Sequence, residues 1–367
     1  MTRLLFLTGP GGAGTTTFAA ATALRAARDG DRVLLLGVDD AGALHAVLDG
    51  AGHANLVVQS FEPHAAAESA LETISKLLSG PLSTAGFSAP EPSELGAVPG
   101  LPDVLALRLV SDAVGSGDWD AVVVDGPPLR PALDLLAWPE TAAAALRRIR
   151  PIEGQAARSL RPLLAGLVGL PSPLTAVTKW TEDAAAEIAG VRRALAGPGS
   201  AIRLVGSPAR SAQPLLATAR TMLALQGLRY DGDMPLDIPR AADEPIGADA
   251  LAALADAVYG TSDPLPAVAE APVPRLVPDG DGYRYELALP GVERNSLNLV
   301  RGGDEIVVTV STARVASHRR AFVLPATLRR CRITSARLED GVLRIGFKPD
   351  ETLWPERLLP ENDDRQD

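Results

Sequence analysis

The sequence predicts an α/β domain built on a parallel sheet with helices on both faces, followed by a small all-β sandwich. Over residues 1–260, short apolar runs alternate with longer alanine- and leucine-rich segments, which is typical of buried parallel strands covered by helices. A glycine-rich loop at 9–17 links the first run to the first helical segment. After a proline-rich linker at 261–274, short runs separated by turn residues predict an antiparallel sandwich.

The elements of the first domain follow from this pattern in chain order. Strands are expected at residues 4–8, 32–38, 55–58, 121–124 and 202–205. Helices are expected at 65–78 and 104–114 and, with an interruption near 171–173, over 135–198. Residues 79–100 are rich in Pro, Gly and Ser, which predicts a surface loop or lid.

The sandwich is expected over residues 275–350, and residues 351–367 are expected to form a polar, frayed tail. Several of its apolar runs alternate in the way that half-buried strands do. Strands are expected at 283–289, 297–299, 305–310, 320–324, 333–338 and 342–347.

Composition narrows the class of protein. The chain of 367 residues is 46% apolar and 22% charged, which suits a soluble globular protein. Its formal net charge of −10 argues against a nucleic-acid partner. A single cysteine, Cys331, excludes an internal disulfide framework and a C-x-x-C zinc site. The longest apolar stretch, 162–177, is broken by Gly and Pro, so we expect a cytoplasmic protein with no stable membrane insertion.

The glycine-rich loop is the strongest indication of chemistry. In a strand–loop–helix setting, backbone N–H groups cradle phosphates, so the loop residues that carry an N–H are candidate nucleotide ligands. These candidates are Gly9, Gly11, Gly12, Ala13, Gly14, Thr15, Thr16 and Thr17. Phosphate loops also need a lysine just before the Ser/Thr, to reach the β- and γ-phosphates. That position is Thr15, so the frame of a nucleotide site is present without its main charge.

On these residues the first domain resembles the ArsA/Get-type ATPases, deviant Walker A proteins with a P-loop NTPase-like fold. Their loop reads G-K-G-G-x-G-K-T-T. Pro10 stands in place of the signature lysine, which in the family crosses a dimer to the partner's nucleotide. Thr15 stands in place of the phosphate-clamping lysine. The resemblance implies a homodimer and a site for ATP or ADP with Mg²⁺.

Later family motifs are also incomplete. The segment D-P-A-H-x-L-S-D keeps its first aspartate as Asp39, but its water-activating second aspartate is Ala46. The switch D-T-A-P-T-G-H keeps Asp125 and Pro128 and loses its hydroxyl and glycine positions. Near residues 230–239, Leu236 aligns with an asparagine that reads adenine in relatives.

These losses predict weak catalysis, since removing one preorganised donor costs roughly 10²–10³ in rate. Thr16 remains a candidate Mg²⁺ ligand beside Asp39 or Asp125, and Arg130 is a candidate substitute for the clamping lysine. A purely structural interpretation is also open. The glycines can serve only the tight turn, Asp125 can cap a strand end, and Asp39 can lie in an exposed turn.

The C-terminal domain resembles the α-crystallin, or small heat-shock, fold. The matching motifs are L-P-G-V at 289–292, R-x-F-x-L-P at 320–325 and G-V-L-x-I at 341–345. The tail has no I-x-I anchor, so large chaperone-type oligomers are not expected. The alternative is a sandwich that serves only as an oligomerisation or docking module.

The hypothesis that follows is a degenerate ArsA/Get-type protein that binds a hydrophobic or protein client as a dimer, without efficient turnover. An apolar stripe over 160–170 is a candidate client site, although such stripes are more often core. The alternative is an active, divergent ATPase that couples hydrolysis to protein targeting or anion handling. A ParA-like scaffold on DNA or membrane would need a basic patch, which the sequence does not display.

Overall fold

The structure is a computed structural model that describes most of the chain. The described residues are 1–38, 41–62, 65–66, 68–69, 72, 100–164, 173–206, 212–233, 244–267, 269–311, 317–350 and 352, without the side chains of 41, 149–164 and 173–180. Several expected segments lie outside these residues in whole or in large part. They are the loop or lid at 79–100, of which only residue 100 is described, most of the helix at 65–78, the interruption near 171–173 before Pro173, residues 165–170 of the apolar stripe, and the tail at 351–367 apart from residue 352.

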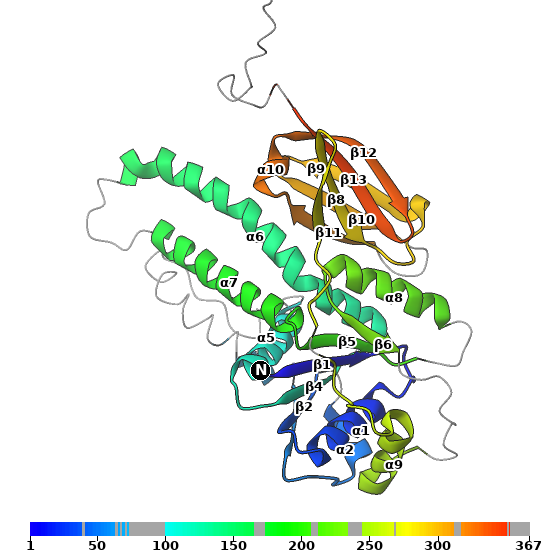
Figure 1. Ribbon diagram of the computed structural model, residues 1–367. Coiled ribbons are helices and arrows are strands. Elements are labelled where there is room, and N and C mark those ends of the chain that lie inside the picture. Colours follow the sequence, from blue (N-terminus) through cyan, green and yellow to red (C-terminus); the bar gives the residue numbers. More distant parts are fainter. Residues whose placement is uncertain are drawn as a thin grey trace, which may run out of the picture. The chain divides into compact units, whose positions relative to one another are not determined.

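A six-stranded parallel sheet forms the centre of the first unit, as the sequence predicts (Figure 1). Its spatial order is β3-β2-β4-β1-β5-β6. The strands are β1 (Arg3–Thr8), β2 (Val33–Gly37), β3 (Leu56–Ser60), β4 (Ala121–Asp125), β5 (Ser200–Leu204) and β6 (Tyr230–Asp233). The central strands are buried on both faces, which is why they appear in the sequence as continuous apolar runs.

Helices cover both faces of this sheet (Figure 1). One face carries α1 (Thr15–Arg28), α2 (Ala41–Leu48) and α9 (Gly247–Tyr259). The other carries α5 (Leu101–Gly115), α6 (Leu129–Leu164) and α7 (Pro173–Leu195). Among the described residues, no helix has an 18-residue stretch apolar enough to span a membrane.

Helix α6 begins at Leu129, six residues before the helical block expected from the sequence. Its first turns bury Leu129, Ala132, Leu133 and Leu136, the spacing of one helix face. Pro131 is tolerated because it stands in the first turn, where no backbone hydrogen bond is lost.

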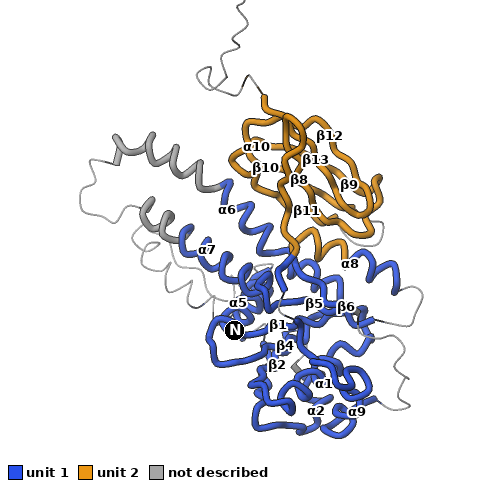
Figure 2. The backbone as a smooth tube through the Cα atoms, in the orientation of Figure 1, with its two compact units in different colours: residues 1–219, 228–271 blue, residues 220–227, 272–367 orange. Residues whose placement is uncertain are grey.

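The chain divides into two compact units, residues 1–219 with 228–271 and residues 220–227 with 272–367 (Figure 2). Helix α8 (Gln213–Gln226) contributes to both. The second unit is an antiparallel sandwich with sheets β11-β10-β9 and β12-β13-β8-β7. Its strands are β7 (Arg275–Asp279), β8 (Gly282–Ala288), β9 (Leu297–Gly302), β10 (Glu305–Val310), β11 (His318–Val323), β12 (Cys331–Glu339) and β13 (Val342–Pro349), with short helices η1 (Arg294–Ser296) and α10 (Ala326–Arg329).

Two edge strands, β6 and β7, were not expected from the sequence. Strand β6 reads YDGD and has no apolar run. Strand β7 is largely exposed and contains Pro278, a residue that sheets accept on edge strands. Neither strand therefore shows the buried apolar pattern by which strands are recognised.

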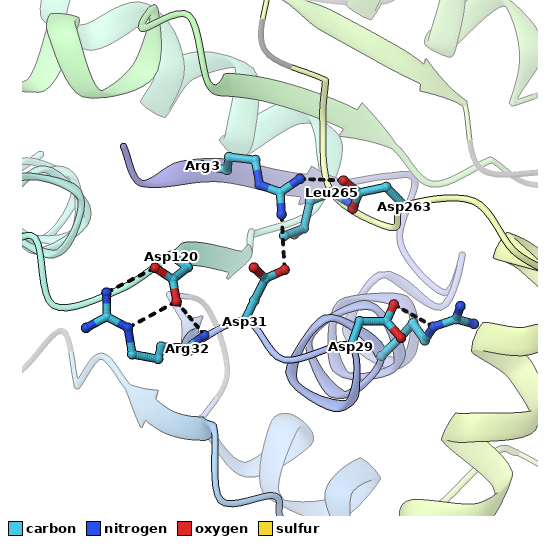
Figure 3. Close-up of polar contacts among 8 residues, drawn as sticks. Arg3, Asp29, Asp31, Arg32, Asp120, Asp263 and Leu265 are labelled. Carbon is cyan, nitrogen blue, oxygen red and sulfur yellow. Dashed lines mark hydrogen bonds and ion pairs between the residues drawn. The ribbon is translucent and has the colours of Figure 1, made fainter.

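Arginine–aspartate pairs tie the amino ends of the central strands to the rest of the first unit (Figure 3). From β1, Arg3 donates to Asp31 at 3.0 Å and to Asp263 at 2.5 Å. Arg32 donates through two side-chain nitrogens and its backbone N–H to Asp120, just before β4. Leu265, which follows α9 in the chain, is buried in the hydrophobic core of the first unit. The segment after α9 therefore packs on that unit through this residue.

We expect Arg32→Ala to raise the pKa of Asp120. The hydrogen bonds from Arg32 hold that pKa at about 2, below the ordinary value of 3.8. A depressed pKa means that the pair stabilises the fold above pH 4 and that this contribution disappears as the pH falls toward 2. NMR titration of the carboxyl carbon should show the pKa of the variant raised from about 2 toward 3.8 but still below it, because the backbone N–H of residue 32 continues to donate to Asp120. Arg28→Ala, an exposed arginine on α1, should leave it at about 2; an equal shift in both variants would contradict the assignment.

Candidate functional site

The glycine loop turns the chain from β1 into α1 at the carboxyl edge of the sheet. Gly9 passes so close to β5 that an added Cβ would lie 2.5 Å from the carbonyl oxygen of Val205. Gly12 and Gly14 have φ values of 74° and 85°, in the left-handed region that favours glycine. Within the loop, the N–H of Ala13 donates to the carbonyl of Pro10 at 3.0 Å. Three of the four glycines are therefore required by backbone geometry alone.

An open pocket of about 380 Å³ lies over this loop. This volume falls in the range of small-molecule sites. Its lining comes from the loop, α1, α2, the segment after β4 and the segment before α9. The lining residues are Gly9, Pro10, Gly11, Gly12, Gly14, Thr15, Thr16, Thr17, Ala43, Ala46, Val47, Gly126, Pro128, Glu244 and Ile246.

Most residues expected at a nucleotide site therefore meet in one place. All loop positions from 9 to 17 line the pocket except Ala13. Pro128 also lines it, and so does Ala46, the residue that the sequence analysis aligns with a water-activating aspartate. Asp125 ends β4 and is only 4% exposed; it is not part of the lining. Asp39 and Leu236 lie outside the described residues.

The electrostatics of the pocket do not suit a polyphosphate. Within the described part of the chain, its lining contains neither lysine nor arginine, and its one charged side chain is acidic Glu244. Arg130 is exposed and is not among the lining residues. What remains for an anion is the first turn of α1, whose free N–H groups and helix dipole favour negative charge. Such a site can hold an anionic oxygen, but it has no cation to neutralise a transferring phosphoryl group.

The segment that follows β4 is attached to the carboxyl end of β1. The N–H of Gly126 donates to the carbonyl of Leu7 at 3.0 Å, and the N–H of Leu129 donates to the carbonyl of Gly9 at 2.8 Å. The hydroxyl of Thr8 donates to the carbonyl of Pro127 at 2.7 Å. A Cβ on residue 126 would overlap the ring of Phe6 and lie 2.6 Å from the carbonyl oxygen of Leu7.

The residues fit a magnesium ion only in part. Thr16 lines the pocket, so its hydroxyl is available as a ligand. The carboxylates considered with it are Asp125, which is buried, and Asp39, which is not described. In the described segments, no three His, Cys, Asp or Glu side chains are grouped so that they could hold a metal ion.

Sequence reasoning missed five lining residues, Ala43, Val47, Gly126, Glu244 and Ile246. Ala43 and Val47 lie on α2, the helix that also carries Ala46. Glu244 and Ile246 stand more than two hundred residues from the loop and belong to none of the motifs considered. Only the fold brings them to the pocket, because α9 packs on α1.

Comparison with known protein families finds a match for each of the two parts of the chain. A family model for the anion-transporting ATPases, ArsA, matches residues 2–234, and one for the HSP20-like domain found in ArsA matches 280–347. An uncharacterized protein of Streptomyces coelicolor is 36% identical, covering 96% of this chain and 99% of its own. A putative arsenical pump-driving ATPase of Aquifex aeolicus is 23% identical, covering 94% and 99%.

Small heat-shock proteins are among the solved structures that are similar to part of this chain. HSP18.5 from E. histolytica is 18% identical with a TM-score of 0.18, covering 24% of this chain and 97% of its own. The family models match in the order expected from the motifs, so both resemblances drawn from the sequence are confirmed. The chain belongs to the anion-transporting ATPase family, ArsA, and ends in the HSP20-like domain found in that family.

Proposed function

We propose that this protein is a degenerate ArsA-type ATPase that binds nucleotide weakly, turns it over slowly or not at all, and acts as a cytoplasmic, client-binding dimer. The observation that carries the proposal is the pocket lining. It keeps the glycine frame of a phosphate site while Thr15, Pro10 and Ala46 replace the groups that act on phosphate in the family. Glu244 adds a negative charge that repels a triphosphate.

The segment after β4 supports the same conclusion. In a working ATPase of this kind, that segment changes conformation with the nucleotide. Here its residues are hydrogen-bonded to β1 and to the loop, and the close approach of Phe6 leaves no room for a side chain at residue 126. Two consecutive prolines, Pro127 and Pro128, further restrict the backbone. A segment held in this way suits a scaffold better than a switch.

Client binding is the remaining part of the proposal. The HSP20-like domain belongs to a fold whose relatives are named heat-shock proteins, and such domains suggest self-association. Together with the dimer implied by the family loop, this supports a dimer that holds a hydrophobic or protein client. Nothing in that role requires hydrolysis.

The second candidate is an active ATPase whose missing cation comes from elsewhere. Arg130 is exposed two residues after Pro128, which lines the pocket, and a guanidinium can replace a lysine at a phosphate. An arginine from a second copy of the chain would serve the same end. Hydrolysis would then be coupled to protein targeting or anion handling.

We expect the purified protein to hydrolyse ATP with Mg²⁺ well below about 1 per second, the lower end for working enzymes. Isothermal titration should show weak ATP or ADP binding. The double variant Pro10→Lys, Thr15→Lys should bind ATP at least tenfold more tightly, because it restores two cations that can pair with the phosphates. Turnover above about 1 per second that depends on Arg130 would instead support the second candidate.

The client-binding role is tested with an aggregation assay on a thermally unfolded reporter protein. We expect the full chain to suppress light scattering at equimolar ratio without ATP, and to the same extent with ATP. The variant Thr15→Lys serves as the matched control, since it changes the pocket and leaves the sandwich intact. Suppression that appears only with hydrolysable ATP would contradict the proposal.

The fixed segment after β4 is tested by adding a single methyl group. Gly126→Ala should destabilise the protein by about 1–3 kcal/mol, because the new Cβ overlaps Phe6. Gly11→Ala is the control, as nothing lies within 4 Å of its Cβ position. Urea denaturation should show a lower midpoint for Gly126→Ala only. Equal midpoints would mean that this segment moves aside easily.

A further inference from the structure

The outer side of the four-stranded sheet gathers basic side chains, and we term it the basic face. On β13, the inward residues Leu343, Ile345 and Phe347 are at most 1% exposed, so the alternate positions point outward. The strand register extends this alternation to β12, β8 and β7. The outward positions hold six basic residues, Arg275, Arg284, Arg332, Arg337, Arg344 and Lys348, and three acidic ones, Asp279, Glu286 and Glu339.

Like charges stand directly opposite each other on this face. Arg337 is paired in register with Arg344, and Arg332 with Lys348. Such cross-strand pairs destabilise a sheet unless an anion lies nearby. Lys348 has Asp281 at 2.9 Å and Arg344 has Glu339 at 3.1 Å, but Arg337 has no carboxylate within 4 Å among the described residues. The basic face therefore carries positive charge that its own carboxylates do not balance.

The opposite edge of the sheet shows the same imbalance. Arg275 on β7 is exposed and, within the described ranges, has no carboxylate within 4 Å. Its cross-strand neighbour Glu286 is instead paired with Arg284 at 2.9 Å and lies 3.7 Å from Arg344. Unbalanced arginines thus stand on both edge strands, where a bound chain can reach them.

The counter-charge is available in the same chain. Residues 272–350 contain thirteen basic and nine acidic residues. Residues 351–367, the acidic tail, contain six acidic and two basic residues. The tail follows β13, a strand of the same sheet, after one intervening residue.

The length of the acidic tail and its attachment next to β13 favour the tail as the segment that covers the basic face. Seventeen residues span up to about 56 Å when extended, whereas four strands are only about 15 Å across. A segment tethered so closely has an effective concentration on the order of millimolar, so weak ion pairs are enough to keep it bound. We propose that the acidic tail binds the basic face of its own chain and shields it from other polyanions.

The charge pattern suits a peptide better than a nucleic acid. Glu286 lies in the middle of the face, in register between Arg275 and Arg344. A continuous phosphate backbone would meet this carboxylate, whereas a peptide with separated carboxylates can avoid it. The tail also has Arg357 and Arg365, which can pair with the acidic residues of the face.

Zero-length carbodiimide crosslinking of the full chain tests this contact. Arg275→Lys and Arg337→Lys keep the charge and each introduce an amine on the basic face, far in sequence from the tail. We expect both to link to the tryptic peptide 358–365, which holds Glu361, Asp363 and Asp364. The links should disappear in 1 M NaCl, where the screening length is about 3 Å. Arg319→Lys, exposed on the other sheet, is the control and should not link.

Isotope labelling and a heparin column complete the test. In a mixture of ¹⁴N- and ¹⁵N-labelled protein, links within one chain join peptides of the same label only. Links that join a ¹⁴N peptide to a ¹⁵N peptide would replace the proposal by a contact between copies. The tail variant Glu361→Gln, Asp363→Asn, Asp364→Asn should elute from heparin at higher salt than the control Asp118→Asn, Glu182→Gln, Asp183→Asn, whose net charge is the same. Equal elution, or equal linking by Arg319→Lys, would overturn the proposal.

Discussion

The carboxyl end of β1 is the constraint on which the first unit depends. It is the point where the strand meets β5 on one side and the segment after β4 on the other. A Cβ added to Gly9 would lie 2.5 Å from the carbonyl oxygen of Val205, and a Cβ added to Gly126 would lie 2.6 Å from that of Leu7. A side chain at either residue would push the strands or the following helices apart. These two glycines are therefore required for packing, whatever the pocket binds.

Under the proposed function, this constraint explains how the glycine loop can persist without the charges of a phosphate site. Gly9 is retained by close approach, and Gly12 and Gly14 by positive φ. Gly11 has neither restriction and lines the pocket. Pro10 and Thr15, which the sequence analysis aligns with family lysines, line the open pocket, where a change alters ligand binding more than folding. Structural and chemical requirements thus act on different residues of one short loop, and the chemical ones are lost more easily.

The sequence was sufficient for the parts that depend on local pattern. Buried strands such as β1 and β4 are continuous apolar runs, and the glycine loop between a strand and a helix identified most of the pocket lining. Glu244 and Ile246 were not predictable, because α9 brings them to the loop from a distant part of the chain. Strands β6 and β7 escaped because β6 has no apolar run and β7 is largely exposed and contains a proline.

The basic face escaped prediction for a different reason, which bears on how net charge is used. A total of −10 is a sum over the chain, and it gives no information on how charge is distributed. Residues 1–271 hold thirty acidic and twenty basic residues, whereas the sandwich has an excess of basic ones. Beyond a Debye length of about 8 Å, these charges are screened from one another, so a ligand senses only the local face. Local composition, taken with strand register, is therefore the better guide to what this chain can bind.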